Sequence, residues 1–158
     1  MPEAYGAATP RRWDARVWTA APRPEVFAYL ADPLNRPEWQ ASLKRVEVLD
    51  EGAPHVGQRW VDHVSVGPPF RLQVTGLEPD RLWEERGSAG PFTALGTLLF
   101  DDETRDGVAG TLVTCVARVR GRGLAAPLGW PATALGALLV RNDLARAARL
   151  LSQRRGRD

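Results

Sequence analysis

The last third of the chain carries its longest stretch at helical spacing, and this stretch has more apolar surface than a surface helix needs. Residues 124–140 contain no charged side chain, and residues 141–153 mix arginines with apolar residues. At 100° per residue, Val140, Leu144 and Leu151 fall on one face of the second part, which therefore predicts an amphipathic helix. The first part is apolar on all sides. Such a helix must be covered on all sides or must face something apolar that is not protein.

The rest of the chain shows the composition of one globular domain. The 158 residues are 44% hydrophobic and 25% charged, which are ordinary values for a domain with a substantial core. A net charge of +2 is too small to indicate a nucleic-acid partner. We expect a flexible lead at 1–11, a single domain at 12–153 and a basic tail at 154–158.

Cysteine usage and the termini favour a cytoplasmic protein. A single cysteine, Cys115, excludes a disulfide within the chain, and the N-terminus has no apolar signal-peptide segment. The uncharged stretch 124–140 is shorter than the roughly 20 residues that a membrane-spanning helix needs, and prolines interrupt it. We therefore expect no transmembrane segment.

Short strand-like segments separated by Gly, Pro and Asp turns occupy the middle of the chain. A strand at 12–20 and two short helices, at 25–31 and 35–39, precede them. The six further strands are predicted at 44–49, 58–66, 70–77, 82–86, 92–100 and 111–119.

The alternation within these segments predicts one buried face. Phe70, Leu72 and Val74 point to one side of their strand, while Arg71 and Gln73 point to the other. An antiparallel sheet with one apolar face needs a cover, and the C-terminal helix is the one predicted element long enough to supply it. The pattern therefore predicts an α+β domain in which a curved sheet wraps around one long helix.

Several segments together resemble the SRPBCC superfamily, which includes START-like lipid carriers, polyketide cyclase/dehydrases and Bet v 1-like proteins. The segment APRPEVFAYLADP (21–33) followed by NRPEW (35–39) is similar to its opening. VGQRW (56–60), LEPDRL (77–82) and GTLVT (110–114) are similar to later motifs in the same order. The resemblance implies a helix-grip fold, in which a seven-stranded antiparallel sheet surrounds the helix, two short helices follow strand 1, and an apolar cavity lies between sheet and helix.

Standard catalytic motifs are absent from the sequence. It has no glycine-rich phosphate loop, no GxSxG, no HExxH and no CxxC. One cysteine and two separated histidines do not supply the three or four ligands of a metal site. We expect neither a metal nor another cofactor.

Three polar residues remain as catalytic candidates: Asp62, His63 and Arg71. Asp62 and His63 are consecutive on a strand and face opposite sides, so they cannot form an acid–base pair with each other. His63 facing the cavity could act as a general base, although an exposed strand histidine is the simpler interpretation. Asp62, if buried, needs a cation, which Arg71 or Arg86 could supply. Which face of the 58–66 strand points into the cavity stays open.

Two acidic residues, Glu84 and Glu85, follow Trp83. Because they are consecutive on a strand, at most one of them is interior, and we favour cross-strand pairing on the surface.

Six tryptophans favour a roomy, aromatic-lined interior, although core packing is the alternative for each of them. The predicted ligand-binding residues are Trp39, Trp60, Val64, Leu72, Val74, Trp83, Leu98, Phe100, Val113, Cys115, Trp130, Leu135 and Leu138.

Three functions stay open at this point. The first is binding of an apolar or aromatic small molecule, such as a lipid, polyketide or isoprenoid, in a carrier or sequestration role. The second is an aromatase/cyclase-like enzyme that folds a polyketide and enolises it with polar cavity groups. The third is docking of the apolar half-helix on a protein or a membrane surface, and a homodimer also stays open. A cavity wall of Val, Leu, Phe and Trp alone would exclude the cyclase. We expect 141–153 to clamp the fold and 124–140 to form an entrance or lid.

Overall fold

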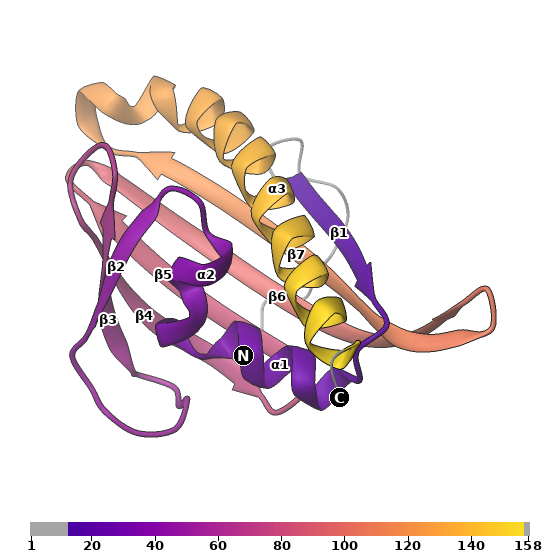
Figure 1. Cartoon of the computed structure of the whole chain (residues 1–158). Helices are drawn as coiled ribbons and strands as arrows, with labels where there is room; N and C mark the ends of the chain where they lie inside the picture. Colours follow the sequence, from indigo (N-terminus) through magenta and orange to yellow (C-terminus); the bar gives the residue numbers. More distant parts are fainter. Residues whose placement is uncertain (1–12, 157–158) are drawn as a thin grey trace.

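The computed structural model describes residues 13–156, without the side chains of residues 13, 130–134 and 137. Seven antiparallel strands form one curved sheet, and a long C-terminal helix runs across its concave face (Figure 1). This arrangement confirms the predicted helix-grip fold. The expected lead at 1–11 and the last two residues of the expected tail lie outside the described residues.

The elements follow one another in the order that the sequence analysis predicted. Their bounds are β1 (Trp13–Thr19), α1 (Arg23–Ala31), η1 (Pro33–Asn35), α2 (Arg36–Trp39), β2 (Leu43–Val48), β3 (Arg59–Val64), β4 (Phe70–Glu78), β5 (Leu82–Ala89), β6 (Phe92–Arg105), β7 (Val108–Gly121), η2 (Gly123–Leu128) and α3 (Gly129–Arg155). The strand order is β1-β7-β6-β5-β4-β3-β2, so β7 returns to pair with β1 after a meander from β2 to β7.

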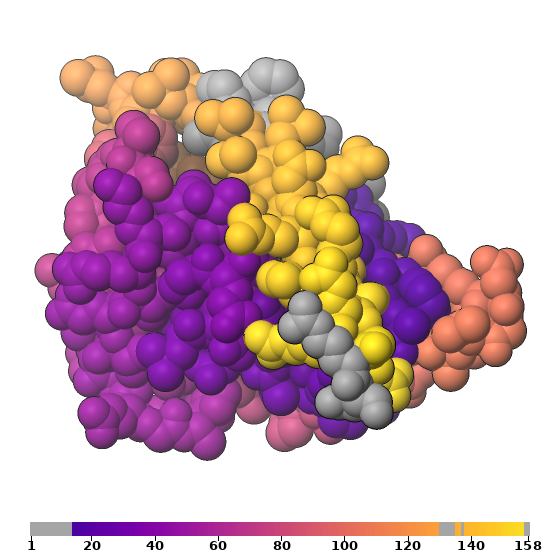
Figure 2. Space-filling model, in the orientation of Figure 1, coloured from indigo at the N-terminus to yellow at the C-terminus, as the bar shows by residue number. Residues whose placement is uncertain are grey.

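The β6–β7 hairpin is longer than predicted and projects beyond the body of the domain (Figures 1 and 2). Its register runs from Phe92↔Gly121 to Arg105↔Val108. Asp106 and Gly107 form the two-residue turn, both at positive φ (49° and 80°), as hairpin turns that match the strand twist require. The polar tip has no apolar alternation, and backbone pairing extends it past the predicted ends, with a hydrogen bond from the Trp18 indole N–H to the Glu103 carbonyl at 3.0 Å.

The two short helices place side chains over the sheet. Pro24 lies in the first turn of α1, where a missing N–H breaks no helical hydrogen bond. The helix ends at Asp32, whose side chain accepts a hydrogen bond from the backbone N–H of Leu34 at 2.9 Å. This turn leads into α2, which directs Arg36 and Trp39 into the interior, where both are buried.

The two halves of α3 differ in burial. In the second half, Leu144, Ala147 and Leu151 are almost fully buried in the core. The hydroxyl oxygens of Ser152 and of Thr19 on β1 lie 3.4 Å apart. In the first half, Leu135 and Leu138 are exposed by 61% and 62%. Figure 2 shows α3 at the surface, between the purple α1–β3 region and β1. Among the described residues, no helix is long and apolar enough to cross a membrane.

Candidate functional site

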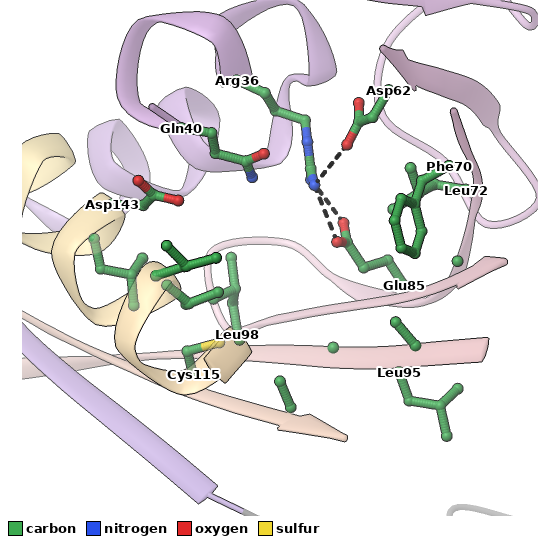
Figure 3. A pocket seen from close by; sticks show the side chains of 18 of the residues that line it. Arg36, Gln40, Asp62, Phe70, Leu72, Glu85, Leu95, Leu98, Cys115 and Asp143 are labelled. Carbon is green, nitrogen blue, oxygen red and sulfur yellow. Dashed lines mark hydrogen bonds and ion pairs between the residues drawn. The ribbon is translucent and has the colours of Figure 1, made fainter. Parts of the chain in front are cut away.

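A cavity of about 280 Å³ lies between the concave face of the sheet, α2 and the first half of α3 (Figure 3). Its floor is made of the small residues Gly87, Ala94, Gly96 and Ala117. The register pairs Gly87 with Ala94 and Gly96 with Ala117, so the small residues lie side by side on three neighbouring strands. Because these residues have little or no side chain, the sheet does not fill the space beneath the helix.

Apolar side chains form most of the wall. The sheet contributes Val64, Phe70, Leu72, Trp83, Leu98 and Cys115, and α3 contributes Leu139, Val140 and Leu144. The thiol of Cys115 is 5% exposed, and burial raises its pKa to about 12. It is therefore neutral at physiological pH and belongs to the apolar surface of the wall.

A buried ionic cluster of Arg36, Asp62 and Glu85 occupies one end of the cavity (Figure 3). Arg36 Nη1 lies 2.8 Å from Glu85 Oε2, and Nη2 lies 3.2 Å from both Glu85 Oε1 and Asp62 Oδ2. The indole N–H of Trp83 donates to Glu85 Oε2 at 2.9 Å. The cluster thus joins α2 to β3 and β5 through charge-assisted hydrogen bonds.

The pKa shifts in the cluster follow from burial and charge. Burial by itself lowers the pKa of Arg36, but Glu85 and Asp62 outweigh it and the net shift is upward, so the guanidinium stays charged. Burial raises the pKa of Asp62, against the opposing effect of Arg36. The indole N–H of Trp60 is buried and has no hydrogen-bond partner among the described residues. Asp62 Oδ1 has no hydrogen-bond partner among the described residues.

A second polar group, Asp143 with Gln40, lies on the α3 side of the cavity (Figure 3). Asp143 is 8% exposed, and its Oδ1 accepts a hydrogen bond from the backbone N–H of Ala41 at 3.1 Å. Burial raises its pKa, while that hydrogen bond and the charges of Arg146 and Arg36 oppose the rise. Within the described part of the chain, Asp143 has no ion-pair partner.

Several residues named from the sequence do lie in the cavity wall. They are Trp39, Asp62, Val64, Leu72, Trp83, Leu98 and Cys115. Because Asp62 lines the cavity, the face of β3 that carries Asp62 is the one that points inward. Its cation is Arg36 rather than Arg71 or Arg86, because those two side chains are exposed and lie outside the wall.

Other named residues lie elsewhere. Trp60, Val74, Phe100 and Val113 are at most 2% exposed and belong to the core behind the cavity. Leu135 and Leu138 face away from the cavity, because Gly136, Leu139, Val140, Asp143 and Leu144 share the inward face at helical spacing. The side chain of Trp130 lies outside the described residues.

Two of the catalytic candidates lie off the cavity. His63 points to the other face of β3, where its Nε2 lies 3.0 Å from Glu47 Oε2. Arg71 is exposed because it alternates with the inward-facing Phe70 and Leu72. His63 and Asp62 are adjacent in sequence, but their side chains therefore lie on opposite faces of the sheet.

Three charged wall residues were missed or misplaced by sequence reasoning. Glu85 was expected on the surface, but it points inward on the same side as Trp83 and Gly87, and that alternation was readable. Asp143 follows Val140 by three residues and so shares its helix face, which was also readable. Arg36 gave no local signal, because an arginine in a short polar helix is ordinarily solvated.

Solved structures of known proteins share this fold. The Zhui aromatase/cyclase from a Streptomyces species has a TM-score of 0.70 at 23% identity, over 91% of this chain and 94% of that one. A protein from Mesorhizobium loti has a TM-score of 0.69 at 16% identity, over 90% and 98% of the two chains. A putative protein of the dynemicin biosynthetic locus has a TM-score of 0.64 at 18% identity, over 90% of this chain but 48% of its own. At these identities the likeness shows the fold alone.

Sequence comparison identifies the family. No curated protein matches the chain. The model of a family described as polyketide cyclase / dehydrase and lipid transport matches residues 12–154. This match confirms the resemblance to the SRPBCC superfamily and spans nearly the whole of the described domain. The chain therefore belongs to the polyketide cyclase / dehydrase and lipid transport family.

Proposed function

We propose that the cavity binds a compact, largely apolar small molecule, such as an aromatic, polyketide or isoprenoid compound, in a carrier or sequestration role. The observation that carries the proposal is the partly open cavity beneath the first half of α3, with a floor of small residues and an otherwise mostly apolar wall. Its volume, about 280 Å³, lies near the lower end of the roughly 300–1,000 Å³ typical of ligand pockets, which favours a compact ligand over a two-chain lipid.

The cavity also accounts for the apolar residues on the inward face of the first half of α3. Gly136, Leu139 and Val140 line the cavity, and a Cβ added at Gly136 would meet no heavy atom within 4 Å, so a ligand would cover this part of the helix. Membership of the family supports the same general role, either small-molecule binding or a cyclase-like reaction.

A cyclase-like activity is the second candidate, because the wall is not made of apolar side chains alone. Arg36, Gln40, Asp62, Glu85 and Asp143 all line it. Of these, burial raises the pKa of Asp62 and of Asp143, and a carboxyl group beside a bound keto group is a candidate for the proton transfer that enolisation needs. In such a reaction the curved wall would hold the chain in a folded, near-attack conformation.

Filling the cavity tests the proposed binding. A Cβ at Gly136 would meet no heavy atom within 4 Å, so Gly136→Leu should project into the cavity without a clash. Asn142→Leu is the matched control, because it adds the same side chain at an exposed position of the same helix. Replacing glycine inside a helix favours the helix by up to about 1 kcal/mol, so Gly136→Leu should fold at least as well as the wild type.

The measurement is the fluorescence of N-phenyl-1-naphthylamine, which rises in an apolar environment. We expect saturable binding by the wild type and by Asn142→Leu, and loss of binding by Gly136→Leu. Unchanged binding by Gly136→Leu would contradict the proposal, and so would a wild type that binds no probe and carries no ligand when purified from its own host.

Native mass spectrometry of protein purified from its host distinguishes the two candidates. A bound compound that stays chemically unchanged during incubation with the protein supports a carrier. Conversion of a bound poly-keto compound with loss of water, abolished in Asp62→Asn or Asp143→Asn, supports the cyclase.

A further inference from the structure

The polar groups of the cavity carry more negative than positive charge. Asp62, Glu85 and Asp143 are carboxyl groups of the wall, and Arg36 is the one cationic side chain among the wall residues that the structure describes. A cavity that received a carboxylate ligand would need the opposite balance. The excess of carboxyl groups over cations therefore bears on which class of ligand the cavity accepts.

Arg36 is already occupied by the protein. Both of its terminal nitrogens bind carboxylate oxygens, at 2.8 Å and 3.2 Å to Glu85 and at 3.2 Å to Asp62. The guanidinium carbon also lies 5.9 Å and 5.4 Å from the rings of Trp39 and Trp60. The remaining nitrogen, Nε, has no hydrogen-bond partner among the described residues, but it is buried and does not face solvent. An incoming anion would have to displace a buried carboxylate and leave it without a cation, which is strongly unfavourable.

Asp143 is the carboxyl group that lacks a cation. One oxygen accepts the N–H of Ala41, and the other has no hydrogen-bond donor among the described residues. Figure 3 shows its carboxylate turned toward Gln40 and the cavity. Arg146 and Arg36 act on Asp143 only through their charge, at longer range than an ion pair. Asp143 is 8% exposed, and its second oxygen is not among the buried polar atoms that lack a partner, so this oxygen stays accessible and a ligand in the cavity can donate to it in place of water.

We infer that the cavity selects apolar molecules that present a hydrogen-bond donor to Asp143, with a protonated amine as the strongest case, and that it rejects apolar carboxylates such as free fatty acids. This inference rests on the proposed function, because it names the ligand class of the same cavity. An ammonium group gains a charge-assisted hydrogen bond to Asp143, and a hydroxyl gains a neutral-donor hydrogen bond to the same oxygen. A carboxylate would enter a wall that holds three carboxyl groups and a single guanidinium, which Glu85 and Asp62 already bind.

Three probes with the same ring system test this selectivity: 1-naphthylmethylamine, 1-naphthalenemethanol and 1-naphthoate. Isothermal titration calorimetry at about pH 7.5 compares their dissociation constants for the full chain. We expect the amine to bind at least as tightly as the alcohol, and naphthoate to bind at least about tenfold more weakly than the alcohol, because like charges brought together in a desolvated site are costly.

Asp143→Asn identifies the group responsible. The amide oxygen can still accept the N–H of Ala41, so the fold should be retained, and melting curves check this. We expect the affinity for the amine to fall about tenfold and the affinity for the alcohol to change by less than about threefold, as loss of a charge-assisted hydrogen bond predicts. The control is Asp101→Asn, which removes one negative charge from the exposed end of β6 and should leave all three affinities unchanged.

The outcomes separate this inference from the proposed function. If all three probes bind equally and Gly136→Leu abolishes their binding, the cavity binds ligands but the inference is overturned. Naphthoate binding as tightly as the amine overturns it as well, and so does an equal loss of amine affinity in Asp101→Asn. If neither these probes nor N-phenyl-1-naphthylamine binds the wild type, the proposed function fails and the inference falls with it.

Discussion

Replacing Arg36 by methionine tests whether the ionic cluster holds the cavity together. The side chain of Arg36 is 8% exposed, and those of Asp62 and Glu85 are 7% and 18% exposed. Without the guanidinium, two carboxylates remain in the interior with no cation among the wall residues. Breaking a buried ion pair by removing one partner costs about 3–5 kcal/mol, a large fraction of the roughly 5–15 kcal/mol by which a domain is stable.

Arg59→Met is the matched control. Arg59 also binds a carboxylate at two points, with Nε and Nη2 at 2.8 Å and 2.9 Å from Asp50, but the pair lies on the surface, with 58% and 30% of the side chains exposed. Surface ion pairs contribute little because water screens them, so Arg59→Met should destabilise the fold far less than Arg36→Met. Similar geometry with different burial isolates the effect of desolvation.

The assay is urea unfolding followed by tryptophan fluorescence and circular dichroism. The triple variant with Arg36→Met, Glu85→Gln and Asp62→Asn should recover at least half of the loss, because no buried charge is then left without a partner. The loss in Arg36→Met alone should also shrink as the pH falls, because burial raises the pKa of Asp62 and protonation neutralises this carboxyl group once its cation is gone. If Arg36→Met costs no more than Arg59→Met, or if the triple variant is less stable than Arg36→Met, the reasoning is refuted.

Three further predictions follow from burial. Burial raises the pKa of Asp143 above its unfolded value of about 3.9, so ionisation of Asp143 should cost the wild type stability as the pH rises from about 4 through the folded pKa, and Asp143→Asn should lack this loss. In urea unfolding at several pH values, the stability of the variant relative to the wild type should therefore increase with pH, and the opposite trend would contradict the assignment. Leu144 is 1% exposed, so Leu144→Ala should lower the free energy of unfolding by about 2–5 kcal/mol, whereas Leu138 is 62% exposed and Leu138→Ala should change it by no more than about 0.5 kcal/mol. Equal shifts of the two variants in thermal melting would mean that both halves of α3 belong to the core. Cys115, buried and with a pKa of about 12, should resist iodoacetamide at about pH 8 until urea unfolds the chain, and fast labelling of the folded protein, measured by intact mass, would show that the cavity is open to water.

The contrast between Leu138 and Leu144 also revises an expectation from the sequence. Because residues 124–140 are apolar throughout, Leu135 and Leu138 looked like ligand contacts. The helix can present only one face to the cavity, and that face passes through Gly136, Leu139 and Val140. A segment that is apolar at every position shows no helical periodicity, so the sequence pattern could not show which of these residues point inward.

The strands were predicted well where alternation and turn residues agree. β4 spans Phe70–Glu78 and was expected at 70–77, because Phe70, Leu72 and Val74 alternate with polar residues and Pro-rich turns bound the segment. The ends of β6 and β7 were missed, because Asp101–Arg105 pair through the backbone without burying side chains. Backbone hydrogen bonds leave no pattern in the sequence, whereas burial does.

Sequence alone determined the order of the elements, the single buried face of the sheet and the long covering helix, because turn chemistry and periodic burial act on neighbouring residues. Tertiary structure alone decided that the cation beside Asp62 is Arg36 and not Arg71 or Arg86. It likewise decided that Arg36 pairs with Glu85, 49 positions away. It also decided that Asp143 is left without a cation beside the cavity. Charge pairing depends on which side chains folding brings within about 3 Å of each other, and residues from different elements meet only once the sheet has curved around the helix.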